Sequence, residues 1–170
     1  MDEIVNKVKN SKLIQLDLAD FKPHEEIIEY DLADNLWEGL ILKEKDFRSF
    51  VKSHDWGQYQ GKAVGVICSA DAIVPTWAFM LIVAELQSAG VTAIVGNATD
   101  VAKSLIQEKI KQYKIDSKEK GLFIIKGCSD IPAPAFAMAE LTKHLMPFAR
   151  SIMYGEPCST VPVYKERNNS

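Results

Sequence analysis

The chain has 170 residues, of which 47% are hydrophobic and 25% charged, with a net charge of −3 at neutral pH. These values are those of a globular protein and exclude a chain that is disordered throughout. The negative charge argues against a nucleic-acid-binding protein, which needs a basic face, and no run approaches the roughly 18 apolar residues of a membrane span. The acidic start, Met1–Glu3, lacks the pattern of a signal peptide, so we expect a cytoplasmic protein.

The first third of the chain has weaker patterns than the rest. Alternating apolar residues predict a strand near the N-terminus, and two later segments compete to be the second strand. A short amphipathic helix follows them. The expected elements are a strand at Leu13–Leu18, a second strand at Glu26–Leu32 or Leu36–Leu42, and a helix at Asp46–Lys52, with residues 1–12 and 165–170 as loose ends.

From residue 63 onward, strands alternate with helices, which is typical of a mainly parallel sheet. Right-handed crossovers would then place the carboxyl ends of all strands at one edge. We therefore expect a single three-layer α/β domain over residues 1–170, with a mainly parallel sheet and helices on both faces. The elements expected here are strands at Ala63–Cys68, Val91–Val95, Gly121–Ile125 and Ser151–Tyr154, helices at Thr76–Ser88, Asp100–Tyr113 and Pro134–Leu145, and a loop at Gly155–Val163.

The most informative feature is the placing of the cysteines. The chain has three, and each is followed directly by a serine: Cys68–Ser69, Cys128–Ser129 and Cys158–Ser159. The first two pairs end strand-like runs and precede an acidic residue, Asp71 or Asp130, then prolines and a helical pattern. We read this echo as a possible degenerate repeat. It predicts two thiols at the carboxyl ends of strands, where open α/β sheets build their sites.

A thiol at the N-terminus of a helix meets unpaired backbone N–H groups and the positive end of the helix dipole, which favour thiolate. The neighbouring serine hydroxyls of Ser69, Ser129 and Ser159 can cap the helix or donate a hydrogen bond to sulfur. Asp71 and Asp130 are capping residues first, and ligands or proton acceptors second.

The three cysteines lack the paired spacing of a zinc finger, so a metal site would have to form from distant corners. If the segment 155–163 folds over the strand ends, Cys158 meets Cys68 and Cys128. Three thiolates with one further ligand suit zinc or an iron–sulfur cluster. Among the histidines, His54 is our first choice for a ligand, because it precedes the strand that leads to Cys68.

Two other interpretations stay open. Cys68 or Cys128 could be the nucleophile of a sulfur- or acyl-transfer enzyme, with an Asp or His as base. Alternatively, the cysteines are structural, since free cysteine is often a small buried hydrophobe, and the chain is a protein-binding module. A metal site needs all three thiols, a nucleophile needs one, and a binding module needs none.

Long segments of the chain resemble a small family of bacterial proteins, found chiefly in Bacteroidetes, whose domain has no assigned function. The resemblance implies no known activity. It does imply an association with genes of Suf-type iron–sulfur assembly, and so iron–sulfur assembly proteins as partners. The segments that carry it are Leu40–Arg48, His54–Trp56, Cys68–Ala78, Lys126–Asp130 and Ser151–Tyr164.

Overall fold

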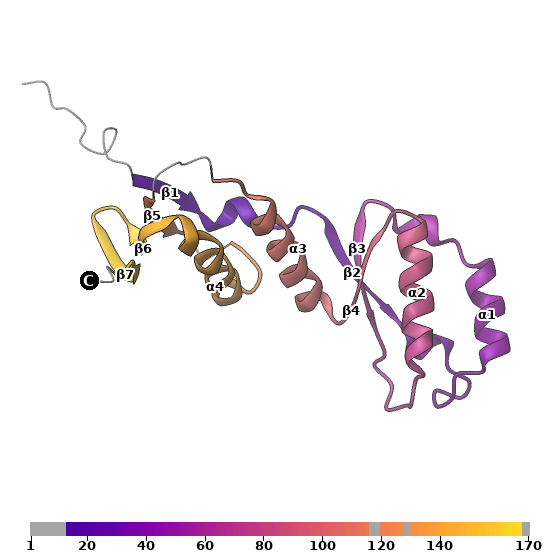
Figure 1. Cartoon of the computed structure of the whole chain (residues 1–170). Helices are drawn as coiled ribbons and strands as arrows, with labels where there is room; N and C mark the ends of the chain where they lie inside the picture. The colour runs from indigo at the N-terminus through magenta and orange to yellow at the C-terminus, as the bar shows by residue number, and fades with distance from the viewer. Residues whose placement is uncertain (1–12, 116–119, 128–129, 168–170) are drawn as a thin grey trace, which may run out of the picture. The chain divides into compact units, whose positions relative to one another are not determined.

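A computed structural model describes residues 13–115, 120–127 and 130–167. Their contacts divide the chain into two compact units (Figure 1). The central unit is Pro23–Ser104, and the terminal unit is Met1–Lys22 with Leu105–Ser170. The fold is mixed α/β, but its strands form two sheets, so the expectation of one sheet is wrong. Alternation of strands and helices does not reveal which strands pair. The prediction of a single domain stays a prediction, because compact units of one chain need not fold alone.

The central unit is a parallel three-stranded sheet with the strand order β2-β3-β4. The two competing predictions for the second strand are resolved in favour of the first, because Trp37 and Ile41 only close a tight turn. Glu38 and Gly39, at the centre of this turn, both have positive φ. The elements are β2 (Glu26–Asp31), α1 (Glu44–Ser53), β3 (Lys62–Ile67), α2 (Thr76–Ser88), β4 (Thr92–Val95) and the start of α3 (Ala98–Gln112).

Strand β3 is buried on both faces. Val64 and Val66 are fully buried and join a core with α1 and α2. On the opposite face a Cβ on Gly65 would lie 3.1 Å from Val101 Cγ2, so the start of α3 packs there. This explains why β3 reads as a continuous apolar run, as buried parallel strands do.

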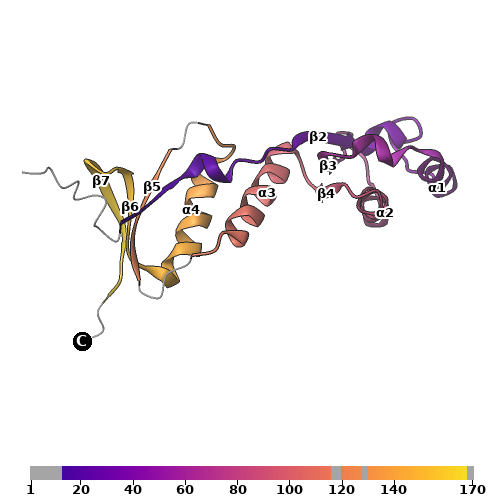
Figure 2. The same ribbon diagram turned by 90° about the horizontal axis from the view of Figure 1, so that it is seen from above.

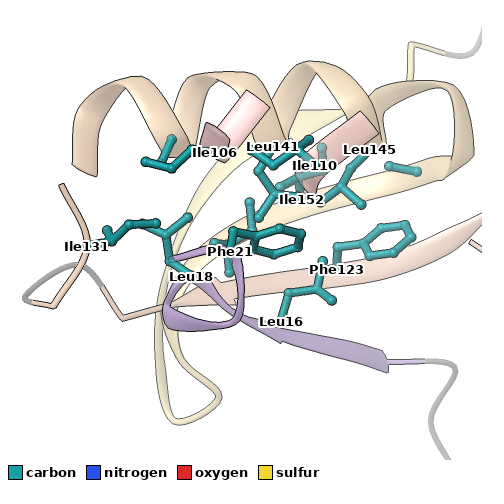
Figure 3. Close-up of a cluster of buried hydrophobic side chains, with 13 residues drawn as sticks. Leu16, Leu18, Phe21, Ile106, Ile110, Phe123, Ile131, Leu141, Leu145 and Ile152 are labelled. Atoms are coloured by element: carbon teal, nitrogen blue, oxygen red, sulfur yellow. The ribbon is translucent and has the colours of Figure 1, made fainter. Parts of the chain in front are cut away.

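The terminal unit is a four-stranded sheet with the order β1-β5-β6-β7. The first three strands are parallel, and β7 is antiparallel to β6. Helix α4 and the second half of α3 pack against one face, seen edge-on in Figure 2. Figure 3 shows their apolar side chains converging on Phe123 and Ile152 of the sheet. The elements are β1 (Leu13–Asp17), β5 (Gly121–Lys126), α4 (Pro134–Leu145), β6 (Ala149–Glu156) and β7 (Ser159–Lys165).

The segment 155–163 is not the loop that its prolines predict. Strand β6 continues to Glu156, turns at Pro157 and Cys158, and pairs with β7. Pro162 is tolerated within β7 because this is the edge strand of the sheet. An edge strand has hydrogen bonds to one neighbouring strand only, so a missing N–H group costs less there.

The two units share one plan. In the terminal unit, Ile125 of β5 pairs with Leu16 of β1 and with Tyr154 of β6. In the central unit, Val66 of β3 pairs with Tyr30 of β2 and Val95 of β4. Val66 precedes Ile125 by 59 positions, and Val95 precedes Tyr154 by the same number. The buried residues of the helices obey the same shift: Ala78, Ile82 and Leu86 in α2, and Ala137, Leu141 and Leu145 in α4.

The shift of 59 positions covers the second strand, the helix and the third strand of each unit. It does not superimpose the cysteines, which are 60 positions apart: Cys68 corresponds to Gly127, and Ser69 to Cys128. Each unit is a β-β-α-β module with a strand, a second parallel strand, a helix and a third parallel strand, and with the same partners opposite one another. The units differ between the first and second strands, which α1 connects in the central unit and the whole central unit with α3 connects in the terminal unit. They also differ after the third strand, where β4 leads into α3 and β6 into the β7 hairpin.

Candidate functional site

Both described cysteines lie just beyond the carboxyl ends of parallel strands. Cys68 directly follows Ile67, the last residue of β3, and Cys158 lies in the turn that follows β6. Both are free thiols; Cys68 is half-buried and Cys158 is exposed. The prediction of a thiol at a strand end is therefore confirmed for Cys68, whereas Cys158, which was expected in a loop, lies in the turn between β6 and β7. Cys128 and Ser129 lie outside the described residues.

The predicted convergence of the three thiols is not tested. Cys68 belongs to the central unit and Cys158 to the terminal unit. Within the described residues, no group of three His, Cys, Asp or Glu side chains is arranged to hold a metal ion. A site that includes Cys128 stays a prediction.

The carboxylate of Asp31, at the end of β2, contacts the corner that contains Cys68. Its Oδ1 accepts the N–H of Ser69 at 3.0 Å and the N–H of Ala33 at 2.9 Å. Burial alone would raise the pKa of Asp31, but hydrogen bonds from the Ser69 hydroxyl and from these two N–H groups lower it. The Ser69 backbone thus bonds Asp31 directly, and the Ser69 side chain also lowers the pKa of the carboxyl.

This arrangement differs from the expected one, in which the serine hydroxyl bonds the sulfur. The Cys68 Sγ instead lies 3.8 Å from the carbonyl oxygen of Ala70, a weak contact at the limit of hydrogen bonding to sulfur. The Cys68 side chain also packs against the core of the central unit. At the other described corner, Ser159 begins β7 opposite Glu156.

The terminal unit has an aspartate at the equivalent position. Asp17 ends β1, accepts the N–H of Ala19 at 3.0 Å and lies opposite Lys126. A Cβ on Gly127, whose φ is 76°, would lie 2.5 Å from Asp17 Oδ1, so the carboxylate touches the backbone immediately before Cys128.

Both aspartates begin the same tetrapeptide, Asp-Leu-Ala-Asp, at residues 17–20 and 31–34. In each case the first aspartate caps a 3₁₀ turn, Leu18–Phe21 or Leu32–Asn35, whose leucine is fully buried. Analysis of the cysteines alone missed these aspartates, yet the exact repetition of four residues at the ends of two strands was the signal that would have found them.

Asp71 and Asp130 do not cap the helices that follow them. Helix α2 begins after Pro75 and α4 after Ala133, and neither has a side-chain cap. The aspartates precede these helices by several residues, so their side chains do not bond the first N–H groups of the helices. Asp130 pairs with Lys22 at 2.9 Å, whereas Asp71 is exposed.

His54 directly follows α1 and lies within an aromatic cluster. Its ring lies 4.4 Å from that of Trp56 and 4.9 Å from that of Phe50, between centroids. Its Nε2 is 3.1 Å from the Tyr59 hydroxyl and 3.2 Å from Gln58 Nε2. The described contacts of this nitrogen are thus a phenol hydroxyl and a side-chain amide. Its predicted role as a metal ligand stays untested.

A model of the family described as "Protein of unknown function (DUF2480)" matches residues 2–166. The chain belongs to this family. The match confirms the predicted membership of a family without assigned function, and does not bear on its distribution among bacteria or its association with iron–sulfur assembly. Comparison with the curated proteins and with the solved structures finds no match.

None of the helices in the described part of the chain is both long enough and apolar enough to cross a membrane.

Proposed function

We propose that this DUF2480 chain is a cytoplasmic accessory protein that binds zinc, iron or an iron–sulfur cluster through Cys68, Cys128 and Cys158. The supporting observation is the position of the described cysteines at strand ends, outside the buried core. A cysteine used as a small hydrophobe is usually fully buried. An exposed thiol in a turn and a half-buried thiol at a strand end fit ligation better than packing.

The terminal unit would supply two of the three thiolates. Cys128 is the second residue after β5 in the sequence, and Cys158 is the second residue after the neighbouring strand β6. Because β5 and β6 are adjacent and parallel, their carboxyl ends share one edge. Zinc and iron–sulfur clusters take thiolates at about 2.3 Å. Asp71, Asp130 or His54 would supply a fourth ligand or orient the thiolates, and proteins of iron–sulfur assembly would be the partners.

A second candidate is a cysteine nucleophile at Cys68. This cysteine is the only one in residues 23–104, and its thiol is free and half-buried directly after β3. The carboxyl ends of parallel strands are where open α/β sheets build their sites. In this case the protein would need Cys68 and tolerate loss of Cys158.

Metal and acid-labile sulfide analysis of protein purified without air tests the first proposal. We expect stoichiometric zinc or iron that is lost in each of the variants Cys68→Ser, Cys128→Ser and Cys158→Ser. The variant Ser88→Ala, whose exposed hydroxyl bonds only within α2, should keep the metal. A metal-free protein would refute the proposal, and a single fast-reacting thiol at Cys68 would then favour the second candidate.

A further inference from the structure

Asp31 contacts the chain on both sides of Cys68. Its backbone lies opposite Ile67, the residue before the cysteine, in the last pair of β2 and β3. Its carboxylate accepts the N–H of Ser69, the residue after the cysteine, at 3.0 Å. A single residue of the neighbouring strand therefore fixes both chain neighbours of the thiol.

Capping of the 3₁₀ turn does not by itself account for this contact. Asp55 caps another 3₁₀ turn, Trp56–Tyr59, by accepting the N–H of Gly57 at 3.0 Å. The cap of that turn consists of this single bond, from the N–H group two positions after the aspartate. Asp31 makes the equivalent bond to Ala33 and, in addition, binds Ser69 on a different strand end.

An aspartate at the equivalent position of the terminal unit makes a related contact, one residue earlier in the segment. Asp17 holds the position that Asp31 holds in the central unit, and its carboxylate touches the backbone at Gly127, which follows the strand opposite. The close approach requires the absence of a side chain at residue 127. Two independent copies of the module thus bring the same carboxylate to the segment that follows the second strand.

We propose that Asp31 is a positioning residue that holds the Cys68–Ser69 corner and keeps the Cys68 thiol half-buried at the end of β3. The proposal rests on the proposed function in one respect, that Cys68 is a working thiol. Without the bond from the Ser69 N–H, the corner would loosen and the thiol would become more accessible to reagents. The Asp31 carboxylate accordingly sets how readily Cys68 meets a metal ion or an electrophile.

The test is the alkylation rate of each cysteine in the full, metal-free chain, measured by mass spectrometry after reaction with iodoacetamide. In Asp31→Ala we expect Cys68 to react about fivefold faster, the change that loss of a hydrogen bond worth roughly 1 kcal/mol produces. Asp31→Asn keeps an acceptor oxygen and should restore most of the slow rate. Cys158, in the other unit, should react at an unchanged rate and serves as an internal control.

Two further variants separate positioning from a general loss of stability. Asp55→Ala removes a comparable cap and should leave the Cys68 rate unchanged. Asp31→Ser retains a capping hydroxyl for Ala33 but is too short to hold Ser69 as well, so it should accelerate Cys68 even if Asp31→Ala does not fold. An unchanged Cys68 rate in a folded Asp31 variant, or equal acceleration of Cys68 and Cys158, would overturn the proposal. The proposed function is tested by metal analysis, whereas the role of Asp31 is tested by alkylation rates in the metal-free chain. Failure of one proposal is therefore distinguished from failure of the other.

Discussion

Gly96 and Gly155 occupy equivalent positions of the two units, 59 residues apart. Gly96 directly follows Val95, which pairs with Val66, and Gly155 directly follows Tyr154, which pairs with Ile125. Both have positive φ, 143° and 117°. A Cβ at Gly155 would lie 2.6 Å from the Ser159 carbonyl oxygen, and one at Gly96 would lie 2.7 Å from Asp100 Oδ2. Each module thus needs glycine where its third strand reaches the carboxyl edge of the sheet, although the chain then continues differently in the two units.

Gly155→Ala should therefore destabilise the protein by about 2 kcal/mol or more, because both the backbone conformation and the contact with a carbonyl oxygen become strained. Urea denaturation followed by circular dichroism measures the free energy of unfolding. Gly61 has a positive φ of 78°, but a Cβ added there would have no atom within 4 Å, so Gly61→Ala is the matched control and should cost less. Equal costs would show that the contact at Ser159 is unimportant.

Ile82→Ala and Leu141→Ala should have similar effects, since the two side chains are fully buried at equivalent positions of α2 and α4. Removing a buried Ile or Leu side chain beyond Cβ costs about 2–5 kcal/mol. The free energy of unfolding of each variant is compared with that of Met80→Ala, whose side chain is 66% exposed. A neutral effect of either core variant would contradict the equivalence of the two helices.

Ala133→Gly should stabilise the protein. Ala133 precedes α4 with φ 49° and ψ 59°, in the left-handed region, where an L side chain costs roughly 1 kcal/mol and glycine costs none. The thermal midpoint should rise by a few degrees. Ala139→Gly, at an exposed position inside the same helix, should instead lower it, because glycine is a poor helix former. A lower midpoint in Ala133→Gly would refute the argument.

The stability of the chain should fall above about pH 10, and Tyr30 should contribute to the fall. Burial raises the pKa of Tyr30 well above its usual value of 10.0. In the unfolded chain the phenol ionises near 10, so the folded state binds more protons at high pH and stability decreases as pH rises. Tyr30→Phe should show a smaller loss of unfolding free energy between about pH 9 and pH 11 than the parent chain.

The comparison for this prediction is Tyr59→Phe. Burial also raises the pKa of Tyr59, but this ring is less buried than that of Tyr30. Its substitution should therefore change the pH dependence less. An identical pH profile in Tyr30→Phe and the parent chain would show that Tyr30 ionises equally in both states.

Local patterns in the sequence determined most elements of this protein. Thr76–Ser88 and Pro134–Leu145 form the predicted helices, because their apolar residues and flanking prolines act within a few turns of chain. The strand end before Cys68 follows from the same short-range signals, whereas the hairpin of β6 and β7 that contains Cys158 does not. The repeated Asp-Leu-Ala-Asp was equally present in the sequence and marks the two equivalent turns.

Only the tertiary structure decided how the strands pair. The separation of the strands into two sheets depends on hydrogen bonds between segments as distant as Leu13 and Leu122, which no local pattern encodes. The same holds for β7, since a strand with a proline is stable there only because β6 lies beside it. The bond from Asp31 to Ser69 likewise joins residues 38 positions apart, because parallel pairing of β2 and β3 brings their ends together.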